Sequence, residues 1–380
     1  MTTMEKRGFR PLAAEAARSP TLPGFYYGDP EVLKTEKARI FEGAWHFIAH
    51  TSELESPGAY VCADILGEPV FVIHGRDGLI SGFYNVCQHR AHKLLTGRGR
   101  ARARIVCPYH AWSYELDGSL AIARLADRMP EFDPADFSLV PVRVEAVLGF
   151  VFVNLSPDAA PLADTHGDMF DDIRATLPWI EEVRVQEGDA GWDGELDANW
   201  KVLAENCLEC YHCGPAHPAF VDLVDMQSYV CVPRGKWLRS AGPVRNLTNS
   251  AYEVGADDPV QESLFWHMWP SFEFGVFPGE RLLTAFRFLP KTPDVTGIFS
   301  LWLAPPGERL DPERARYRST VLWPEDKAIC ESVHQGLKSR GYRQGRFVVN
   351  PRHPAVSEHA VHHFQRLYAE AMGLGEAQAS

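Results

Sequence analysis

Two short stretches, each holding one cysteine and one histidine, constrain the fold of this chain more than any other feature. One residue separates Cys87 from His89, two separate Cys107 from His110, and residues 90–106 lie between the pairs. Such a set can hold a tetrahedral zinc ion, or a [2Fe–2S] cluster with thiolates on one iron and imidazoles on the other. Zinc sites usually pair like spacings, whereas each loop here offers one thiolate and one imidazole. The pattern favours the histidine-ligated iron–sulfur cluster.

A second motif, within residues 205–217, indicates a single iron ion. His212 and His217 are five positions apart, so on an unbroken helix their side chains would point about 140° apart. The dipeptide Gly214-Pro215 lies between them, and we expect it to end the helix and let His217 fold back. Two imidazoles and one carboxylate on one face of a metal form the facial triad of oxygen-activating non-haem Fe(II).

The third ligand must come from elsewhere in the chain, and the helix predicted after Pro324 offers Glu325 and Asp326. At about 100° per residue, Asp326 falls near the middle of the apolar stripe of this helix and Glu325 lies roughly 95° away. A carboxylate directed into a core needs a partner, and a metal ion is a suitable one. We therefore predict Asp326 as the ligand and Glu325 as a solvated acid of the first turn. The predicted stripe is Ile329, Cys330, Val333 and Leu337.

The second motif also contains Cys207, Cys210 and Cys213, which are spaced like the first three cysteines of a bacterial [4Fe–4S] ferredoxin run. The run occurs once, and the position of the fourth cysteine is His217. We therefore expect the three thiols to be packing residues. The segment also keeps helical spacing, which predicts one common face, at Glu205, Glu209 and His212.

Composition excludes several classes of protein. The 380 residues are 45% hydrophobic and 23% charged, as in ordinary globular proteins. A net charge of −12 argues against a nucleic-acid partner, whose phosphates are neutralised by Lys and Arg. The most apolar stretch, residues 139–155, contains Arg143 and Glu145, and residues 1–20 carry charges throughout, so neither a membrane span nor a secretory signal is predicted. Eight cysteines favour metal binding over a disulfide framework, and we expect a cytoplasmic protein.

The order of predicted elements indicates an α+β fold with two main domains. A helix is expected over residues 31–44, after which short β-rich runs with turn signals predict an antiparallel β domain over 45–155. Later strands and helices predict an antiparallel sheet with helices on its faces over 156–380. The N-terminal segment 1–44 is expected to pack on that second domain. The expected later elements are strands at 228–232, 272–277, 282–289 and 297–304 and helices at 197–214, 324–340 and 354–372.

With both metal motifs in one chain, the sequence resembles the α-subunits of Rieske non-haem iron oxygenases over about residues 25–370. The resemblance implies a Rieske [2Fe–2S] domain, a helix-grip catalytic domain with a mononuclear Fe(II), and a homotrimer. It also implies that Glu209 couples the two centres between subunits, hydrogen-bonding His212 and reaching His110 of the partner subunit. Ring-hydroxylating members mostly have Asp at that position, and Glu is typical of the quaternary-amine branch.

Within this branch the segments 209–218 and 331–343 are close to those of carnitine monooxygenase. The resemblance implies that the substrate, carnitine or γ-butyrobetaine, is hydroxylated beside its quaternary nitrogen and that C–N cleavage releases trimethylamine. Electrons would come from NAD(P)H through a separate FMN/[2Fe–2S] reductase. The alternatives are an N-demethylase of glycine betaine or stachydrine, a ring-hydroxylating oxygenase of a small aromatic acid, and an electron-transfer or zinc-stabilised binding protein.

An aromatic run, residues 265–277, offers a binding site for a quaternary ammonium group, which is held by aromatic faces and carboxylates. Alternation along a strand would turn only half of these side chains toward the substrate. A buried aromatic strand that serves only as core is an equally strong interpretation. The candidate cage residues are Trp266, Trp269, Phe272 and Phe274, with Tyr211 nearby in sequence.

Overall fold

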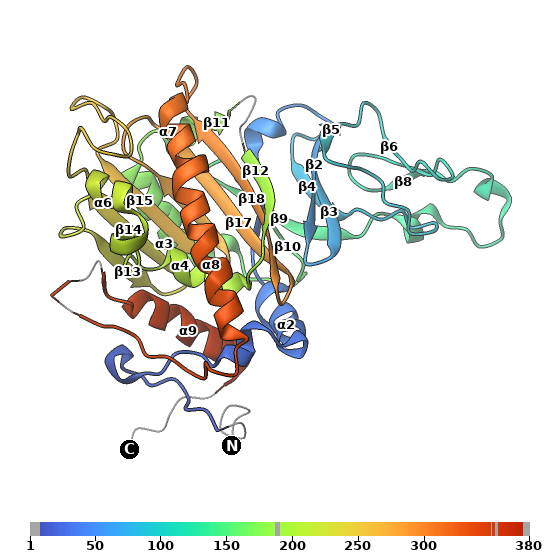
Figure 1. Cartoon of the computed structure of the whole chain (residues 1–380). Coiled ribbons are helices and arrows are strands. Elements are labelled where there is room, and N and C mark those ends of the chain that lie inside the picture. Colours follow the sequence, from blue (N-terminus) through green and yellow to red (C-terminus); the bar gives the residue numbers. More distant parts are fainter. Residues whose placement is uncertain (1–7, 187–190, 351, 354–355, 375–380) are drawn as a thin grey trace. The chain divides into compact units, whose positions relative to one another are not determined.

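The structure is a computed structural model that describes residues 8–186, 191–350, 352–353 and 356–374 (Figure 1). It divides into two compact units, Glu42–Thr165 and a larger unit of the residues up to Phe41 together with those from His166 onward. Residues 156–165, which we predicted to belong to the catalytic domain, are tied to the smaller unit because Leu162 N donates to Glu145 Oε2 at 2.8 Å. In the described ranges, no helix is long and apolar enough to cross a bilayer.

The smaller unit is built from antiparallel strands, as predicted. Its main sheet runs in the order β1-β10-β9-β4-β3-β2-β5, and a small second sheet runs β6-β7-β8. The loops that follow β4 and β6 carry the two Cys/His pairs. The strands are β1 His46–His50, β2 Ala59–Ile65, β3 Glu68–His74, β4 Ile80–Tyr84, β5 Arg98–Arg100, β6 Ile105–Val106, β7 Ser113–Tyr114, β8 Leu120–Ile122, β9 Pro141–Val147 and β10 Phe150–Asn154.

The larger unit contains one antiparallel sheet with helices on its faces, which confirms the predicted α+β class. The sheet runs in the order β11-β18-β17-β16-β15-β14-β13, and β12 also pairs with β18. The long hairpin of β17 and β18 and the neighbouring β16 and β15 form the middle of this sheet. The strands are β11 Arg184–Val185, β12 Gly191–Leu196, β13 Val230–Arg234, β14 Trp237–Pro243, β15 Glu262–Met268, β16 Phe272–Val276, β17 Leu283–Thr292 and β18 Val295–Ala304.

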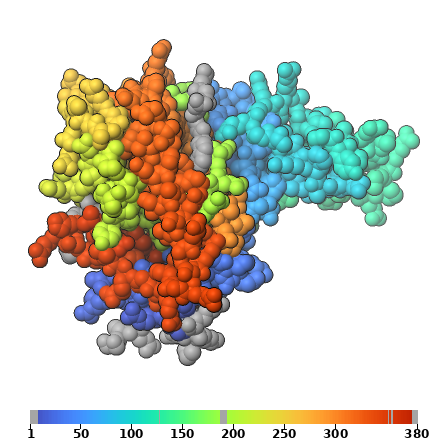
Figure 2. Space-filling view, in the orientation of Figure 1, coloured from blue at the N-terminus to red at the C-terminus, as the bar shows by residue number. Residues whose placement is uncertain are grey.

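Helices cover both faces of this sheet. On one face, Asp172 of α3 accepts a hydrogen bond from Trp266 Nε1 on β15 at 2.8 Å. On the other face, α8 extends across the sheet, and its outer surface forms a continuous band beside α6 (Figures 1 and 2). The helices are α2 Pro30–Glu36, α3 Leu162–Thr176, α4 Trp200–Cys207, α5 Cys213–Ala216, α6 Pro218–Leu223, α7 Pro312–Tyr317, α8 Trp323–Leu337 and α9 His359–Met372.

The N-terminal helix is fixed to the larger unit by a buried cluster of polar groups. Glu36 at the end of α2 accepts hydrogen bonds from Lys201 Nζ at 2.6 Å, from Trp200 Nε1 at 2.8 Å and from Tyr368 OH at 2.7 Å. The side chains of Glu36 and Lys201 are fully buried, so each charge depends on the other for compensation. The cluster joins α2, α4 and α9.

Two predicted helices have different bounds. The helix expected to continue to Gly214 ends at Cys207, because the carboxylate of Glu209 accepts from the backbone N–H groups of Tyr211 and His212, which an unbroken helix would bond to backbone carbonyls. The residues Glu205, Glu209 and His212 therefore do not share a helix face, contrary to our prediction. The predicted start of the last helix, Pro354, lies outside the described residues, and α9 begins at His359.

Glu205 instead points toward the N-terminal segment and α9. Its Oε1 accepts hydrogen bonds from Tyr27 OH at 2.7 Å and from Gln365 Nε2 at 2.8 Å. Burial raises the pKa of Glu205 to about 7, although these donors and the charge of Lys201 oppose the shift. The carboxyl group therefore holds a proton more tightly in the folded chain than in the unfolded one.

This shift predicts how stability depends on pH. Between the unfolded pKa of about 4.5 and the folded pKa of about 7, only the folded state binds the proton, so the free energy of unfolding falls as pH rises, by roughly 3 kcal/mol. Glu205→Gln keeps an acceptor for both donors and removes the charge, so we expect the variant to lose less stability than the wild type from pH 5.5 to 8. Urea unfolding followed by tryptophan fluorescence at both pH values would test this, and parallel profiles would contradict it.

Candidate active site

The two Cys/His loops of the smaller unit have the same backbone design. Ala91 N donates to Cys87 O at 2.9 Å, and Ala111 N donates to Cys107 O at 3.0 Å. Both alanines have positive φ, 56° and 59°, so each loop turns sharply just after its histidine. The matching turns present a thiol and an imidazole from each loop to a common site.

The four side chains fit a two-iron cluster better than a single zinc ion. Cys87 and Cys107 are buried, whereas His89 is exposed and its ring centroid lies 4.7 Å from that of His110. A zinc ion would draw at least three ligand atoms within a few ångströms of one another. Among the described residues, three such ligand atoms lie within 4.8 Å of one another in His212, His217 and Asp326, and not in the two Cys/His loops. Paired thiols beneath paired imidazoles match the ligand division of a Rieske [2Fe–2S] cluster.

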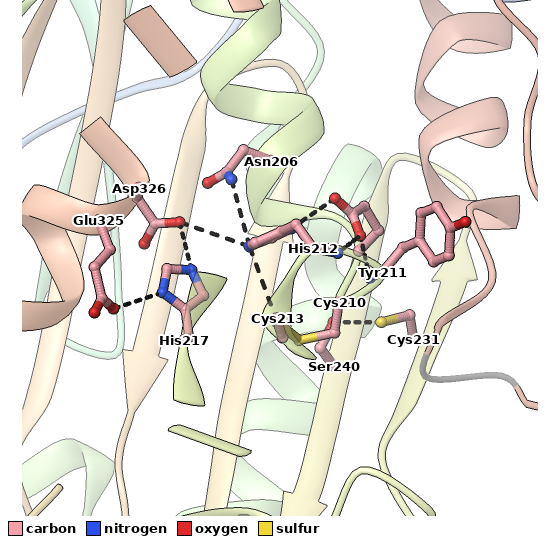
Figure 3. The surroundings of a disulfide bond; sticks show 11 residues. Asn206, Cys210, Tyr211, His212, Cys213, His217, Cys231, Ser240, Glu325 and Asp326 are labelled. Carbon is pink, nitrogen blue, oxygen red and sulfur yellow. Dashed lines mark hydrogen bonds and ion pairs between the residues drawn. A yellow bond between two sulfur atoms is a disulfide. The ribbon is translucent and has the colours of Figure 1, made fainter. Parts of the chain in front are cut away.

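The structure brings the three predicted iron ligands of the larger unit together. One atom from each of His212, His217 and Asp326 lies within 4.8 Å of the others. Asp326 Oδ1 is 3.0 Å from His217 Nε2 and 3.6 Å from His212 Nε2 (Figure 3). The short helices α5 and α6 make this possible. The helical backbone is interrupted before α5 and again at His217, so His217 returns to the same side as His212. The donor set fits a non-haem Fe(II) ion.

A carboxylate orients each of the two imidazoles. His212 Nδ1 is 2.6 Å from Glu209 Oε1, and His217 Nδ1 is 2.8 Å from Glu325 Oε2 (Figure 3). In both rings Nε2 is left to face Asp326. Carboxylates in this outer position fix the ring orientation and make the imidazole a stronger metal ligand. Our prediction of Glu325 as a solvated acid is therefore wrong, since its side chain is only 32% exposed and bonded to His217.

The site is electrostatically arranged to hold a cation. Burial alone would lower the pKa of His212, but its hydrogen bonds to Asp326 and Glu209 outweigh burial and raise the pKa to about 9. Burial would raise the pKa of Asp326, yet the two histidines bring it below its usual value. Positive charge is thus favoured where the nitrogens and the carboxylate meet. A metal ion competes with protons for these same atoms.

The buried face of α8 differs from the predicted stripe. Val333 is 47% exposed, while Cys330 and His334 are buried. His334 was overlooked as a core residue because it is polar, and its Nε2 lies 2.9 Å from Asp294 Oδ1. Asp326 is four positions before Cys330, so it still lies on the inward face and the inference about its direction is unaffected.

We expected the three cysteines of the second motif to be free thiols that serve in packing, and this prediction is wrong for two of them. Cys210 and Cys213 form a disulfide, and their Cα atoms are 4.8 Å apart in the turn that leads into α5 (Figure 3). Cys207 is free and ends α4. Two of the three thiols that a ferredoxin-like cluster would need are therefore bonded to each other, and the disulfide closes the turn that carries His212.

The metal triad opens into a cavity of about 890 Å³ between the sheet and the helices α4, α5 and α8. Along with His212, His217 and Asp326, the lining includes Glu209, Glu273 and Arg316. A volume of this size suits a small-molecule substrate. Aromatic side chains form much of the wall, from Tyr229, Phe265, Phe277, Phe286, Trp302 and Trp323.

The residues predicted for a cation cage lie outside this lining. Trp266 points toward α3, and Phe274 packs against Phe170 of α3, with ring centroids 6.4 Å apart. Trp269 packs on Trp200, and Phe272 packs on Phe274. Alternation along β15 and β16 turns the other set, which includes Phe265 and Glu273, toward the cavity.

Tyr211 is also outside the cavity lining. Its side chain extends on the far side of His212 from Asp326 (Figure 3) and is 49% exposed.

Glu273, which lines the cavity, was not predicted from the sequence. The signal for it was present, because it is the only acidic residue in the aromatic run 265–277.

Comparison with protein families gives matches to both units. A model described as the ring hydroxylating alpha subunit (catalytic domain) matches residues 184–374, and one described as the Rieske [2Fe-2S] domain matches residues 44–133. The chain belongs to the Rieske non-haem iron oxygenase family. Membership confirms the resemblance seen in the two motifs, and it implies a Rieske cluster and a mononuclear iron.

Among curated members of the family, the carnitine monooxygenase oxygenase subunit of Acinetobacter pittii is 37% identical over 356 residues, covering 92% of this chain and 94% of the relative. That of Escherichia coli K12 is also 37% identical, over 359 residues, with 92% and 93% covered. The glycine betaine monooxygenase oxygenase subunit of Chromohalobacter salexigens is 32% identical, with 86% and 81% covered. Similarity thus extends over nearly the whole chain.

Solved structures of the family show the same architecture. A quaternary ammonium Rieske monooxygenase, described in relation to carnitine oxidation and inter-subunit electron transfer, superposes with a TM-score of 0.89 at 35% identity and covers 95% of this chain and 98% of its own. Naphthalene 1,2-dioxygenase from Rhodococcus sp. has a TM-score of 0.79 at 20% identity, with 93% and 94% covered, which shows the common fold alone.

Proposed function

We propose that this chain is the oxygenase component of a two-component Rieske monooxygenase that acts on carnitine or γ-butyrobetaine. The observation that carries the proposal is the 37% identity over 92% of the chain with carnitine monooxygenase oxygenase subunits. Crystal structures of the similar CntA contain L-carnitine or γ-butyrobetaine as substrate. The aromatic cavity beside the metal triad supports a substrate with a quaternary ammonium group.

The reaction inserts one oxygen atom of O2 into the C–H bond next to the quaternary nitrogen. The second oxygen atom leaves as water, with two electrons and two protons. The hydroxylated carbon then forms an aldehyde as its C–N bond breaks, and the nitrogen departs as trimethylamine.

The residues of the chain have separate tasks in this reaction. Cys87, Cys107, His89 and His110 would hold the cluster, and His212, His217 and Asp326 the Fe(II), which together supply electrons and activate O2 when bound. Glu209 and Glu325 keep each Nδ1 occupied, so that each Nε2 faces the third ligand. The aromatic wall excludes water from the substrate carbon.

An electron donor, an assembly state and a cellular location complete the proposal. An FMN/[2Fe–2S] reductase would supply electrons from NAD(P)H. The chain would act as a homotrimer, in which Glu209 links His212 to His110 of the partner subunit, and it would work in the cytoplasm. The position of Glu209 supports this role, because its carboxylate contacts His212 directly and remains partly exposed, at 12%.

Product analysis tests the substrate and the reaction together. Purified protein, a suitable reductase, NADH and carnitine are expected to give trimethylamine in about one-to-one ratio with NADH consumed. Glycine betaine and stachydrine serve as parallel substrates. Formaldehyde from either, without trimethylamine from carnitine, would support the alternative N-demethylase, which the 32% identity to a glycine betaine monooxygenase subunit favours next. Turnover of an aromatic acid alone would contradict both.

A further inference from the structure

One carboxylate in the cavity has no part in holding the iron. Glu273 lies on β16 and lines the cavity. In the sheet it stands opposite His267 on β15 and opposite Phe286 on β17. Its side chain is only 12% exposed, so the charge is largely removed from bulk water.

The protein compensates this buried charge poorly. The imidazole of His267 lies nearby, but its Nδ1 is 3.8 Å from Glu273 Oε2, which is beyond hydrogen-bond distance. Among the described residues, Glu273 Oε2 and both ring nitrogens of His267 lack hydrogen-bond partners. Burial raises the pKa of Glu273, although His267 and the Cys207 thiol oppose the shift. A carboxylate kept in such surroundings is costly unless a cation comes to it.

The surroundings of Glu273 select the kind of cation. Phe286, its neighbour on β17, has its ring centroid 6.2 Å from that of Trp323, and Phe265 lies on the adjacent strand. All three rings line the cavity. Aromatic faces and a carboxylate whose Oε2 has no hydrogen-bond partner among the described residues suit a cation that has no N–H groups, because such an ion needs charge and apolar contact rather than hydrogen bonds.

The position of Glu273 in the cavity also suits a substrate whose reacting carbon lies near the metal ligands. Glu273, Cys207 and Asp326 all line the same cavity. Arg316 lines the same cavity, is exposed, and among the described residues its guanidinium has no ion-pair partner. A substrate with its ammonium at Glu273 and its carboxylate toward Arg316 would keep the carbon beside nitrogen near the metal ligands.

We propose that Glu273 is the residue that selects quaternary ammonium substrates, by placing its carboxylate against the trimethylammonium group beside Phe286 and Trp323. The proposal rests on the proposed function for the identity of the natural substrate. It makes Glu273 a specificity-determining residue, distinct from the metal ligands and from Glu209.

Glu273→Gln tests this proposal, because it removes the charge and keeps the shape. The probes are γ-butyrobetaine, tetramethylammonium as a competitive inhibitor, and 5,5-dimethylhexanoate, in which carbon replaces the quaternary nitrogen. We expect the KM for γ-butyrobetaine and the inhibition constant of tetramethylammonium to rise at least about tenfold, with little change in the inhibition constant of 5,5-dimethylhexanoate, whose tert-butyl group is uncharged. Glu273→Asp should keep most of the discrimination, and Glu262→Gln, at an exposed position of β15, should behave as the wild type.

Equal changes in Glu273→Gln for the ligands with a quaternary ammonium group and for the tert-butyl analogue, or no change at all, would overturn the proposal. Iron content and the cluster spectrum show whether each variant has folded. If Glu273→Gln does not fold, the wild type and Glu273→Asp provide the test: both must bind γ-butyrobetaine at least about tenfold more tightly than 5,5-dimethylhexanoate, and equal affinities would overturn the proposal. Tetramethylammonium binding that depends on Glu273, without carnitine turnover, would reject the proposed function alone.

Discussion

Asp326→Ala is expected to lose the mononuclear iron while the cluster keeps its two irons. Asp326 supplies the one oxygen ligand of the triad, and its Oδ1 is the atom on which both imidazoles converge. Without it, two histidines remain, and the opposite charge that holds the cation is gone. Iron per chain should fall from about three to about two, with an unchanged Rieske spectrum and no detectable turnover.

The neighbouring acid provides a matched control. Glu325 contacts His217 Nδ1 from outside the triad, so Glu325→Ala should weaken iron binding or activity by about 10- to 100-fold rather than abolish it. Excess Fe(II) should restore the Glu325 variant and not the Asp326 variant. If Asp326→Ala retains its full iron content while Glu325→Ala loses the mononuclear iron, the assignment of the two acids is reversed.

Glu209→Ala is expected to retain all iron and to lose turnover by at least about 100-fold. Its carboxylate bonds Nδ1 of His212 at 2.6 Å and accepts from the backbone N–H of the same residue at 3.1 Å. Under our proposal this group also reaches the Rieske histidine of the partner subunit, so its loss interrupts electron transfer between intact centres. Iron analysis and steady-state product formation measure the two effects separately.

Two conservative variants separate the bridge from simple support of His212. Glu209→Gln keeps an acceptor for the imidazole and loses the charge, and Glu209→Asp shortens the reach by one methylene. If the carboxylate only orients His212, Glu209→Gln should be nearly as active as the wild type. If it forms the bridge, both variants should reoxidise the reduced cluster slowly when substrate and O2 are added. Unimpaired turnover by Glu209→Ala would rule out the bridging role.

The parts of the molecule that local spacing determines were predictable from the sequence. The two Cys/His loops and the pair of His212 and His217 follow from ligand spacing, and the two-domain α+β class follows from turn signals and alternation. Asp326 followed from helical phase, even though Val333 proved to be exposed. These inferences need only the geometry of one segment at a time.

Features that depend on tertiary partners were not predictable. Side chains alternate along β15 and β16, and the set that faces the cavity depends on what packs on each side of the sheet. Trp266 and Phe274 pack against α3, on the side away from the cavity. The role of Glu325 depends on the distance to His217, and the early end of α4 depends on a side chain that captures backbone N–H groups. These contacts join residues that are far apart in the chain or depend on the tertiary fold, so they cannot be predicted from the spacing of residues in a single sequence.

A single-turnover experiment tests the central claim most directly, namely that this chain holds both the electron store and the oxygenating centre. The purified protein is reduced chemically without oxygen, freed of reductant, and mixed with carnitine and O2 in the absence of any reductase. We predict that the cluster is oxidised and that trimethylamine forms, at up to about one per active site, with the rate dependent on carnitine. Oxidation of the cluster without trimethylamine, or a protein without a Rieske spectrum, would contradict the account.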